Sequence, residues 1–166
     1  MISQIKIGVF ALATFIMCTI ACQSPKEKQL ELVRNLEAND STFSDTLIGQ
    51  LKNAYLDFVA KYPGDPQNAE FLFKAAQRCI YLDQPKEAIQ HLDSLLKNFP
   101  KSSLVEETLF LKAYTLENSM HDFGAARTAY QEFLKKYPKG ELAADAQFSL
   151  GHMGESPDQL LMEEGQ

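Results

Sequence analysis

Apolar side chains recur every three or four residues along much of this chain, and polar side chains fill most positions between them. The segment 123–137 is a clear example, because Ala126, Tyr130 and Phe133 fall on one face of a helix while charged residues take the other. Pro138 ends the run, since proline lacks an amide hydrogen and disfavours helical geometry in the residue before it. The pattern predicts an amphipathic helix that stops at a proline corner.

The proline corner occurs three times. Its aromatic-proline pairs are spaced by 37 and 38 residues and stand at Tyr62-Pro63, Phe99-Pro100 and Tyr137-Pro138. Apolar residues recur at fixed distances from these prolines: Tyr55, Leu92 and Tyr130 eight before, Phe58, Leu95 and Phe133 five before, and Phe73, Phe110 and Phe148 ten after. Such self-similarity indicates a repeat architecture, in which each unit buries its apolar face against its neighbours.

The repeats predict an all-α fold, a helical-hairpin solenoid of about two and a half to three repeats over residues 44–152. The helices that we expect there cover 46–62, 66–82, 85–99, 102–118, 122–137 and 140–151. Upstream, residues 22–29 are expected to form a polar tether, and 30–43 a weak amphipathic helix followed by a linker. Downstream, residues 153–166 are expected to form a capping helix and an acidic tail.

The first 21 residues have a different character. A single Lys6 precedes an apolar run of 14 residues at 7–20, which is shorter than the roughly 20 residues that a membrane-spanning helix needs. The run predicts a secretory signal peptide at 1–21, with an uncleaved signal-anchor or ordinary signal-peptidase cleavage as alternatives. The residues 19–22, Thr-Ile-Ala-Cys, resemble the lipobox of bacterial lipoproteins. That resemblance implies lipidation of Cys22 and attachment to a membrane through its acyl chains.

Neither the composition nor the spacing of residues indicates a catalytic, metal-binding or nucleic-acid-binding site. The net charge of −6 disfavours nucleic acid, which is held by basic patches. The three histidines, His91, His121 and His152, are 30 and 31 residues apart, which is not the spacing of a metal site. Cys79 is the one cysteine downstream of the lipobox, and we expect it to be a buried, inert thiol. No glycine-rich phosphate loop occurs in the sequence. We therefore expect no enzyme activity, no metal site, no cofactor and no small-molecule substrate.

A candidate binding groove follows from the repeat register. An acid stands seven residues after each corner proline and a phenylalanine three residues further on, so each repeat would present both on one face of its first helix. Together with Tyr114, this groove would suit a partner segment with basic and apolar side chains. Alternatively, the phenylalanines fill the core between repeats and the acids sit at helix N-termini, where negative charge is favoured. The residues concerned are Glu70, Phe73, Glu107, Phe110, Tyr114, Asp145 and Phe148.

The second helix of each unit resembles that of the tetratricopeptide repeats. In that family a small residue is followed four positions on by an aromatic residue or leucine, and eight positions later by proline. Two units match this pattern, with Ala88, Leu92 and Pro100 in one and Ala126, Tyr130 and Pro138 in the next. The helix ends FVAKYP and FLKKYP are similar to those of BamD-type outer-membrane assembly lipoproteins and of the YbgF/CpoB coordinator of the Tol-Pal system.

These resemblances imply a non-catalytic, membrane-anchored scaffold for protein-protein interaction in the bacterial cell envelope. Its expected location is the outer membrane, lipid-anchored and facing the periplasm. Its expected role is in outer-membrane protein assembly or in Tol-Pal and cell-division coordination. One alternative is a periplasmic chaperone-like binder of extended peptides. A subunit for glycan uptake is disfavoured because the chain has no tryptophan to form a sugar platform.

Overall fold

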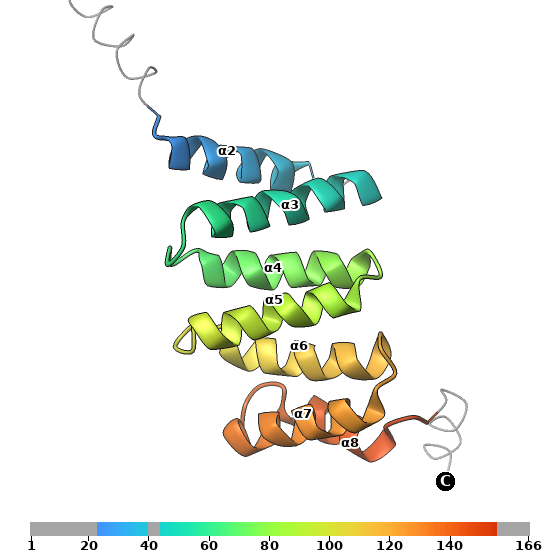
Figure 1. The fold of residues 1–166 in the computed structure, drawn as a ribbon. Helices are drawn as coiled ribbons and strands as arrows, with labels where there is room; N and C mark the ends of the chain where they lie inside the picture. Colours follow the sequence, from blue (N-terminus) through green and yellow to red (C-terminus); the bar gives the residue numbers. More distant parts are fainter. Residues whose placement is uncertain (1–22, 40–43, 156–166) are drawn as a thin grey trace, which may run out of the picture.

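The computed structural model describes residues 23–39 and 44–155. Within these ranges the chain forms seven helices that follow one another as antiparallel hairpins (Figure 1): α2 (Pro25–Ala38), α3 (Asp45–Lys61), α4 (Asn68–Tyr81), α5 (Pro85–Asn98), α6 (Val105–Asn118), α7 (Phe123–Lys136) and α8 (Ala143–His152). The predicted signal peptide, Cys22, most of the linker at 40–43 and the predicted capping helix and tail from 156 onward lie outside the described residues. None of the helices described is long and apolar enough to cross a membrane.

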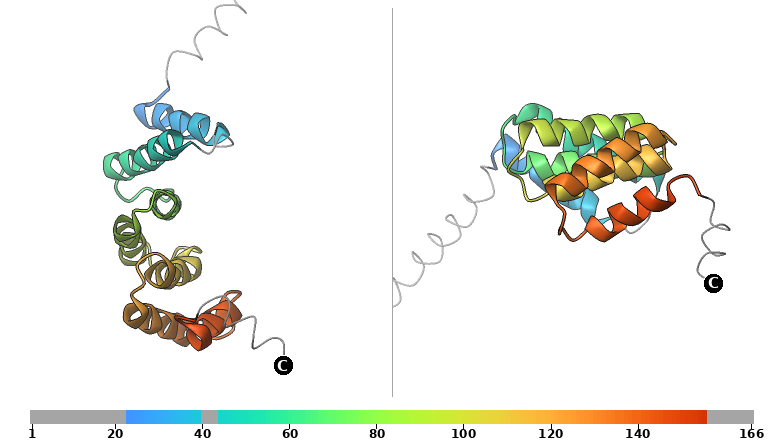
Figure 2. Two further views of the ribbon diagram at one scale, coloured as in Figure 1. Left: turned by 90° about the vertical axis from the view of Figure 1, so that its right-hand side faces the viewer. Right: turned by 90° about the horizontal axis from the view of Figure 1, so that it is seen from below.

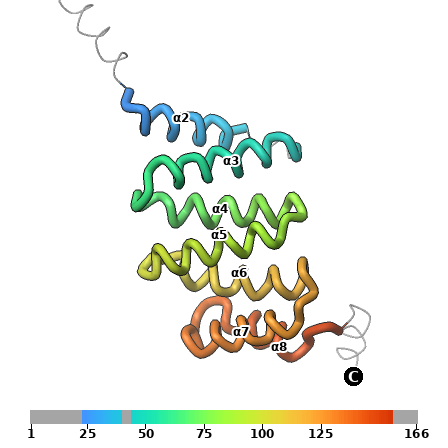
Figure 3. Tube along the Cα trace, viewed as in Figure 1, coloured from blue at the N-terminus to red at the C-terminus, as the bar shows by residue number. Residues whose placement is uncertain are grey.

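The helices stack as a solenoid. Each helix packs against its neighbours in sequence, and the chain winds back and forth without crossing itself (Figure 3). Viewed end-on, α5 and α7 lie along one side of the stack while α4, α6 and α8 lie along the other (Figure 2). The prediction of an all-α, helical-hairpin architecture is confirmed.

Each proline corner ends a helix in the same way. The aromatic residues Tyr62, Phe99 and Tyr137 leave the helical region, with ψ of 62°, 52° and 61°, yet each still donates its amide to the carbonyl four residues back. A turn closed by a hydrogen bond of 3.0 to 3.2 Å then precedes α4, α6 and α8. These helices therefore begin two or three residues later than the sequence pattern predicts.

The expected tether at 22–29 is wrong for its second half, because helix α2 already begins at Pro25. Ser24 and Glu27 form a capping box, in which the Ser24 amide donates to Glu27 Oε2 at 2.7 Å and the Glu27 amide donates to Ser24 Oγ at 3.2 Å. Proline at the first helical position adds to this start signal. Helix α2 packs against α3 and buries Val33, so the two form a hairpin of their own.

The core consists of small residues and rings at the repeat positions. Ala88 and Ala126 are fully buried where α5 and α7 approach the preceding helices. The residues eight and five positions before each corner proline are also fully buried: Tyr55, Leu92, Tyr130, Phe58, Leu95 and Phe133. The repeat register read from the sequence is therefore the register of the core.

Candidate protein-binding face

Helices α4, α6 and α8 lie along the same side of the stack (Figure 2), and their exposed side is here termed the first-helix face. The three predicted acids, Glu70, Glu107 and Asp145, are all exposed and each stands in the first turn of its helix. A carboxylate at that position interacts favourably with the helix dipole. The three carboxylates thus stabilise the N-termini of their helices. Two of them, Glu107 and Asp145, are also available to bind a partner protein.

Glu70 is the acid that is already paired. The Lys74 ammonium lies 2.7 Å from Glu70 Oε1 and 2.8 Å from Glu37 Oε1, so it bridges α4 and α2. It also lies 5.9 Å from the centroid of the Tyr55 ring. Glu107 and Asp145 form no ion pair within the described ranges. The negative charge available on this face is therefore concentrated on α6 and α8.

Phe73 and Phe110 lie largely between helices. Phe73 is half-buried and packs against the buried clusters of α4 and α5. Phe110 meets the rings of Tyr130 and Phe133 edge-on, with both centroids 5.8 Å away. Phe73 and Phe110 therefore pack as the alternative interpretation expects, in the core between repeats and not on an open groove.

Tyr114 and Phe148 differ, because much of each ring is open to solvent. Tyr114 is 45% exposed and stacks on Phe110, whereas Phe148 is 56% exposed and stacks on His152 with centroids 4.2 Å apart. Both line a cleft of about 530 Å³ between α6, the start of α7 and α8, which also includes Phe123. Phe123 is 42% exposed. We call this site the aromatic cleft.

Sequence analysis missed Phe123. It stands at the first position of α7, outside the seven-and-ten spacing that marked the other groove residues, and only the fold brings it to the cleft. A sequence signal did exist, namely an aromatic residue in the short loop and helix start after Asn118.

Glu117 lies in the lining of the aromatic cleft and accepts a 2.9 Å hydrogen bond from the hydroxyl of Tyr130. Burial is the main reason that the pKa of Tyr130 lies well above its usual range; Ser149 opposes the shift and Glu117 adds to it. The phenol therefore stays protonated at neutral pH and holds the Glu117 carboxylate in place. The cleft thus combines the exposed rings of Tyr114, Phe123 and Phe148 with a carboxylate, that of Glu117, which a hydrogen bond holds in place.

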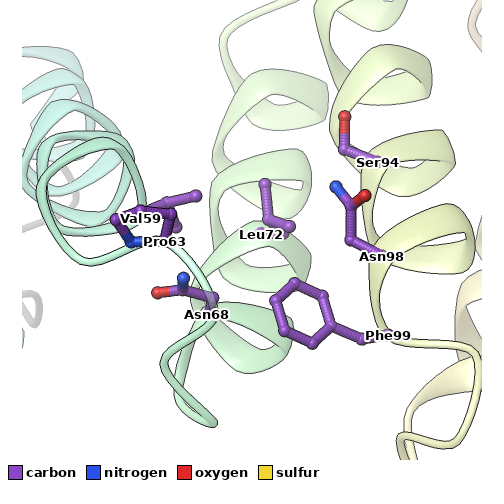
Figure 4. A pocket seen from close by; sticks show the side chains of 8 residues that line it. Val59, Pro63, Asn68, Leu72, Ser94, Asn98 and Phe99 are labelled. Carbon is purple, nitrogen blue, oxygen red and sulfur yellow. The ribbon is translucent and has the colours of Figure 1, made fainter.

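A second cleft, of about 480 Å³, lies at the corner edge of the stack between α3, α4 and α5 (Figure 4). Asn68 is buried there and donates a 2.8 Å hydrogen bond to the Tyr62 carbonyl, which fastens the first proline corner. Its other lining residues include Val59, Leu72 and Phe99. The described residues that line this cleft are apolar or carry neutral amide and hydroxyl groups.

Comparison with known proteins agrees with the architecture. Residues 70–102 and 107–140 match the family of the tetratricopeptide repeat. These segments cover the hairpins α4–α5 and α6–α7 almost completely. Over 87 residues the chain is 35% identical to the mitochondrial import receptor subunit TOM70 of Homo sapiens. This similarity covers 50% of the present chain and 14% of the receptor subunit, so it concerns a small part of that relative.

Tetratricopeptide repeats suggest protein-protein interaction and are typically non-catalytic, which fits a face that offers rings and carboxylates. The family match and the hairpin stack lead to the same result. Two hairpins of this chain, α4–α5 and α6–α7, match the tetratricopeptide repeat in both sequence and helix arrangement.

Proposed function

We propose that this protein is a non-catalytic scaffold that binds another protein through its first-helix face, with the aromatic cleft as the main contact. The observation that carries the proposal is the exposure of Tyr114, Phe123 and Phe148 around one cleft. Clustered exposed rings are characteristic of binding surfaces, because aromatic residues dominate the energetics of protein interfaces.

The cleft and its surroundings favour one kind of partner segment. Apolar side chains would fill the space between the three rings, while basic side chains would meet Glu107, Asp145 and Glu117. A helical or extended segment that combines the two classes would satisfy both. The similarity to a receptor subunit for mitochondrial import supports a role in recognising protein chains.

We place this scaffold in the bacterial cell envelope, anchored to the outer membrane through acyl chains on Cys22 and facing the periplasm. The support is the lipobox-like run before Cys22 and the helix ends that resemble envelope lipoproteins. Outer-membrane protein assembly and Tol-Pal coordination are the two pathways that this resemblance favours. A chaperone-like binder of extended peptides is the alternative, since the same cleft would accept apolar side chains from many chains.

Crosslinked pull-down from solubilised envelopes tests the proposal. The native protein is compared with the double variant Tyr114→Ser, Phe148→Ser and with the triple variant in which Glu70, Glu107 and Asp145 become lysine. Tyr81→Ser is the matched control, because Tyr81 is 54% exposed but does not line the cleft. We expect one stoichiometric partner with the native protein and the control, and its loss with both the double aromatic variant and the triple acid variant.

Circular dichroism and thermal unfolding establish that each variant is folded before recovery is compared. Equal recovery by the native protein, the double aromatic variant and the triple acid variant would refute the first-helix face as the binding surface. Recovery of many unrelated unfolded chains, in place of one partner, would favour the chaperone-like alternative.

A further inference from the structure

We propose that Cys79, Glu87 and His91 form a binding site for a transition-metal ion of the zinc class. The three residues lie away from the aromatic cleft, so the proposal does not depend on the protein-binding role. Cys79 stands near the end of α4, and Glu87 and His91 stand four residues apart on α5. A spacing of four places two side chains on one helix face, and the tight α4–α5 turn brings Cys79 against that face.

The geometry is close to that of a bound site. One ligand atom from each residue lies within 4.8 Å of the other two, and Cys79 Sγ is 4.0 Å from Glu87 Oε2. Zinc binds sulfur at about 2.3 Å and nitrogen or oxygen at about 2.0 Å in a tetrahedron, so bound ligand atoms stand roughly 3.5 Å apart. Small side-chain rotations would close the difference. Glu87 is well placed for this, since its side chain is 51% exposed and can move.

The unpaired ring nitrogen of His91 is a second observation. Its Nε2 is buried and has no hydrogen-bond partner among the described residues. Buried ring nitrogens are normally paired, because an unsatisfied polar atom away from water is unfavourable. A ligated ion would satisfy this ring.

A cation already occupies part of the site. The Lys52 ammonium reaches across from α3 and lies 3.2 Å from Glu87 Oε2 and 2.7 Å from Gln84 Oε1. It therefore competes with a metal for the same carboxylate, and a bound ion would leave it paired with Gln84 alone. A thiol binds a metal as its thiolate, so the metal must displace the Cys79 thiol proton on binding.

The donor set selects the class of ion. One sulfur, one ring nitrogen and one carboxylate oxygen suit zinc or cobalt, whereas calcium and magnesium prefer oxygen ligands throughout. Three protein ligands leave the fourth tetrahedral position for water. The ion would brace α4 against α5 within the first matched repeat, whose bounds are residues 70–102.

Cobalt binding provides the test, because Co²⁺ reports thiolate ligation through a charge-transfer band in the near ultraviolet and tetrahedral geometry through visible bands. The full chain is purified in detergent with Cys18→Ser and Cys22→Ser, so that Cys79 is the remaining thiol. We expect both bands on adding Co²⁺ and their loss when Zn²⁺ displaces it. Zn²⁺ should also raise the midpoint of thermal unfolding by mass action.

Three variants assign the ligands. Cys79→Ser should remove the charge-transfer band, and His91→Gln should weaken Zn²⁺ binding by at least about 10-fold, the lower end of what loss of even an outer-shell group costs. Glu87→Gln should weaken it in the same direction. His121→Asn is the control and should bind like the parent, since His121 is exposed and asparagine tolerates its φ of 52°.

Lys52→Met supplies a result that a purely structural cluster would not give. Removal of the competing ammonium frees Glu87, so Zn²⁺ should bind severalfold more tightly than to the parent. The proposal is overturned if the parent shows no thiolate band, or if Cys79→Ser and His91→Gln, shown by circular dichroism to be folded, bind the metal as the parent does. Looser binding to Lys52→Met would also contradict it.

Discussion

The hydroxyl of Tyr55 donates a 2.9 Å hydrogen bond to Glu37 Oε1 and so joins α3 to α2. Tyr130 makes the same 2.9 Å contact with Glu117 and joins α7 to α6. Both tyrosines stand eight residues before a corner proline, so the two hairpins share one internal contact. This correspondence makes α2 the first helix of a hairpin equivalent to α6–α7, although sequence analysis placed it outside the repeats.

We expect Tyr55→Phe to destabilise the protein by about 1–2 kcal/mol, since it removes a buried hydrogen bond to a carboxylate while keeping the ring. Urea unfolding followed by circular dichroism measures the change. Tyr62→Phe is the control, because the Tyr62 hydroxyl makes no hydrogen bond within the described part of the chain, and its effect should stay within about 0.5 kcal/mol. Equal effects of both changes would show that the Glu37 contact adds nothing to stability.

The pH dependence of stability should carry a signature of Glu37. Burial alone would raise its pKa, but hydrogen bonds from Lys74 and Tyr55 outweigh burial and lower it below the ordinary value. The folded state therefore favours the charged carboxylate. Its contribution is present above the unfolded-state pKa of about 4.3 and is lost as the pH falls through the folded-state pKa.

Urea midpoints measured from neutral to acidic pH should therefore fall less steeply below about pH 4.3 in Glu37→Gln than in the native protein. Glu31→Gln, which changes an exposed glutamate of the same helix, is the control. Identical acid profiles for Glu37→Gln and the native chain would be inconsistent with the bridge to Lys74 and Tyr55.

Ala126 is fully buried where α7 packs against α6, so Ala126→Asp would bury an unpaired charge. We expect a loss of roughly 3–5 kcal/mol, the cost typical of an uncompensated buried charge, or failure to fold. Ala144→Asp is the matched control, because Ala144 is exposed in the first turn of α8, where negative charge is favoured. Differential scanning calorimetry compares the two, and an unchanged midpoint for Ala126→Asp would mean that the α6–α7 packing is wrong.

The lipid anchor is tested directly at Cys22. Cys22→Ala should abolish incorporation of labelled fatty acid and release the protein from envelope membranes into the soluble fraction. Cys18→Ala, four residues upstream, should leave labelling unchanged. Persistent fatty-acid labelling of Cys22→Ala would contradict the assignment of residues 19–22 as a lipobox.

The repeat register could be predicted from sequence because its determinants are local. A proline that follows a helical run ends the run through its own backbone geometry, and apolar residues at steps of three and four define a buried stripe before any partner helix is known. The corner prolines therefore located the helix ends to within a few residues, and the residues eight and five positions before each proline are fully buried as the pattern predicts.

The apolar stripe of helix α2 is sparse, so the sequence pattern predicts only its second part, whereas a capping box at Ser24 marks its true start. Its membership of the stack depends on contacts far along the chain. Lys26 pairs with Asp65 beyond α3, and Glu37 pairs with Lys74 on α4. No periodicity in residues 25–38 encodes these partners.

By itself, then, the sequence determined the helices, their order and which residues are apolar. Tertiary structure decided which apolar residues are exposed. Phe73, Phe110 and Phe148 share one register position, yet Phe73 and Phe110 pack against buried clusters of neighbouring helices while Phe148, on α8, is 56% exposed. The tertiary structure also decided which charged side chains form ion pairs, and it placed Cys79, Glu87 and His91 close together. Exposure and long-range pairing depend on neighbouring helices, whereas helix formation depends on the residues within a few turns.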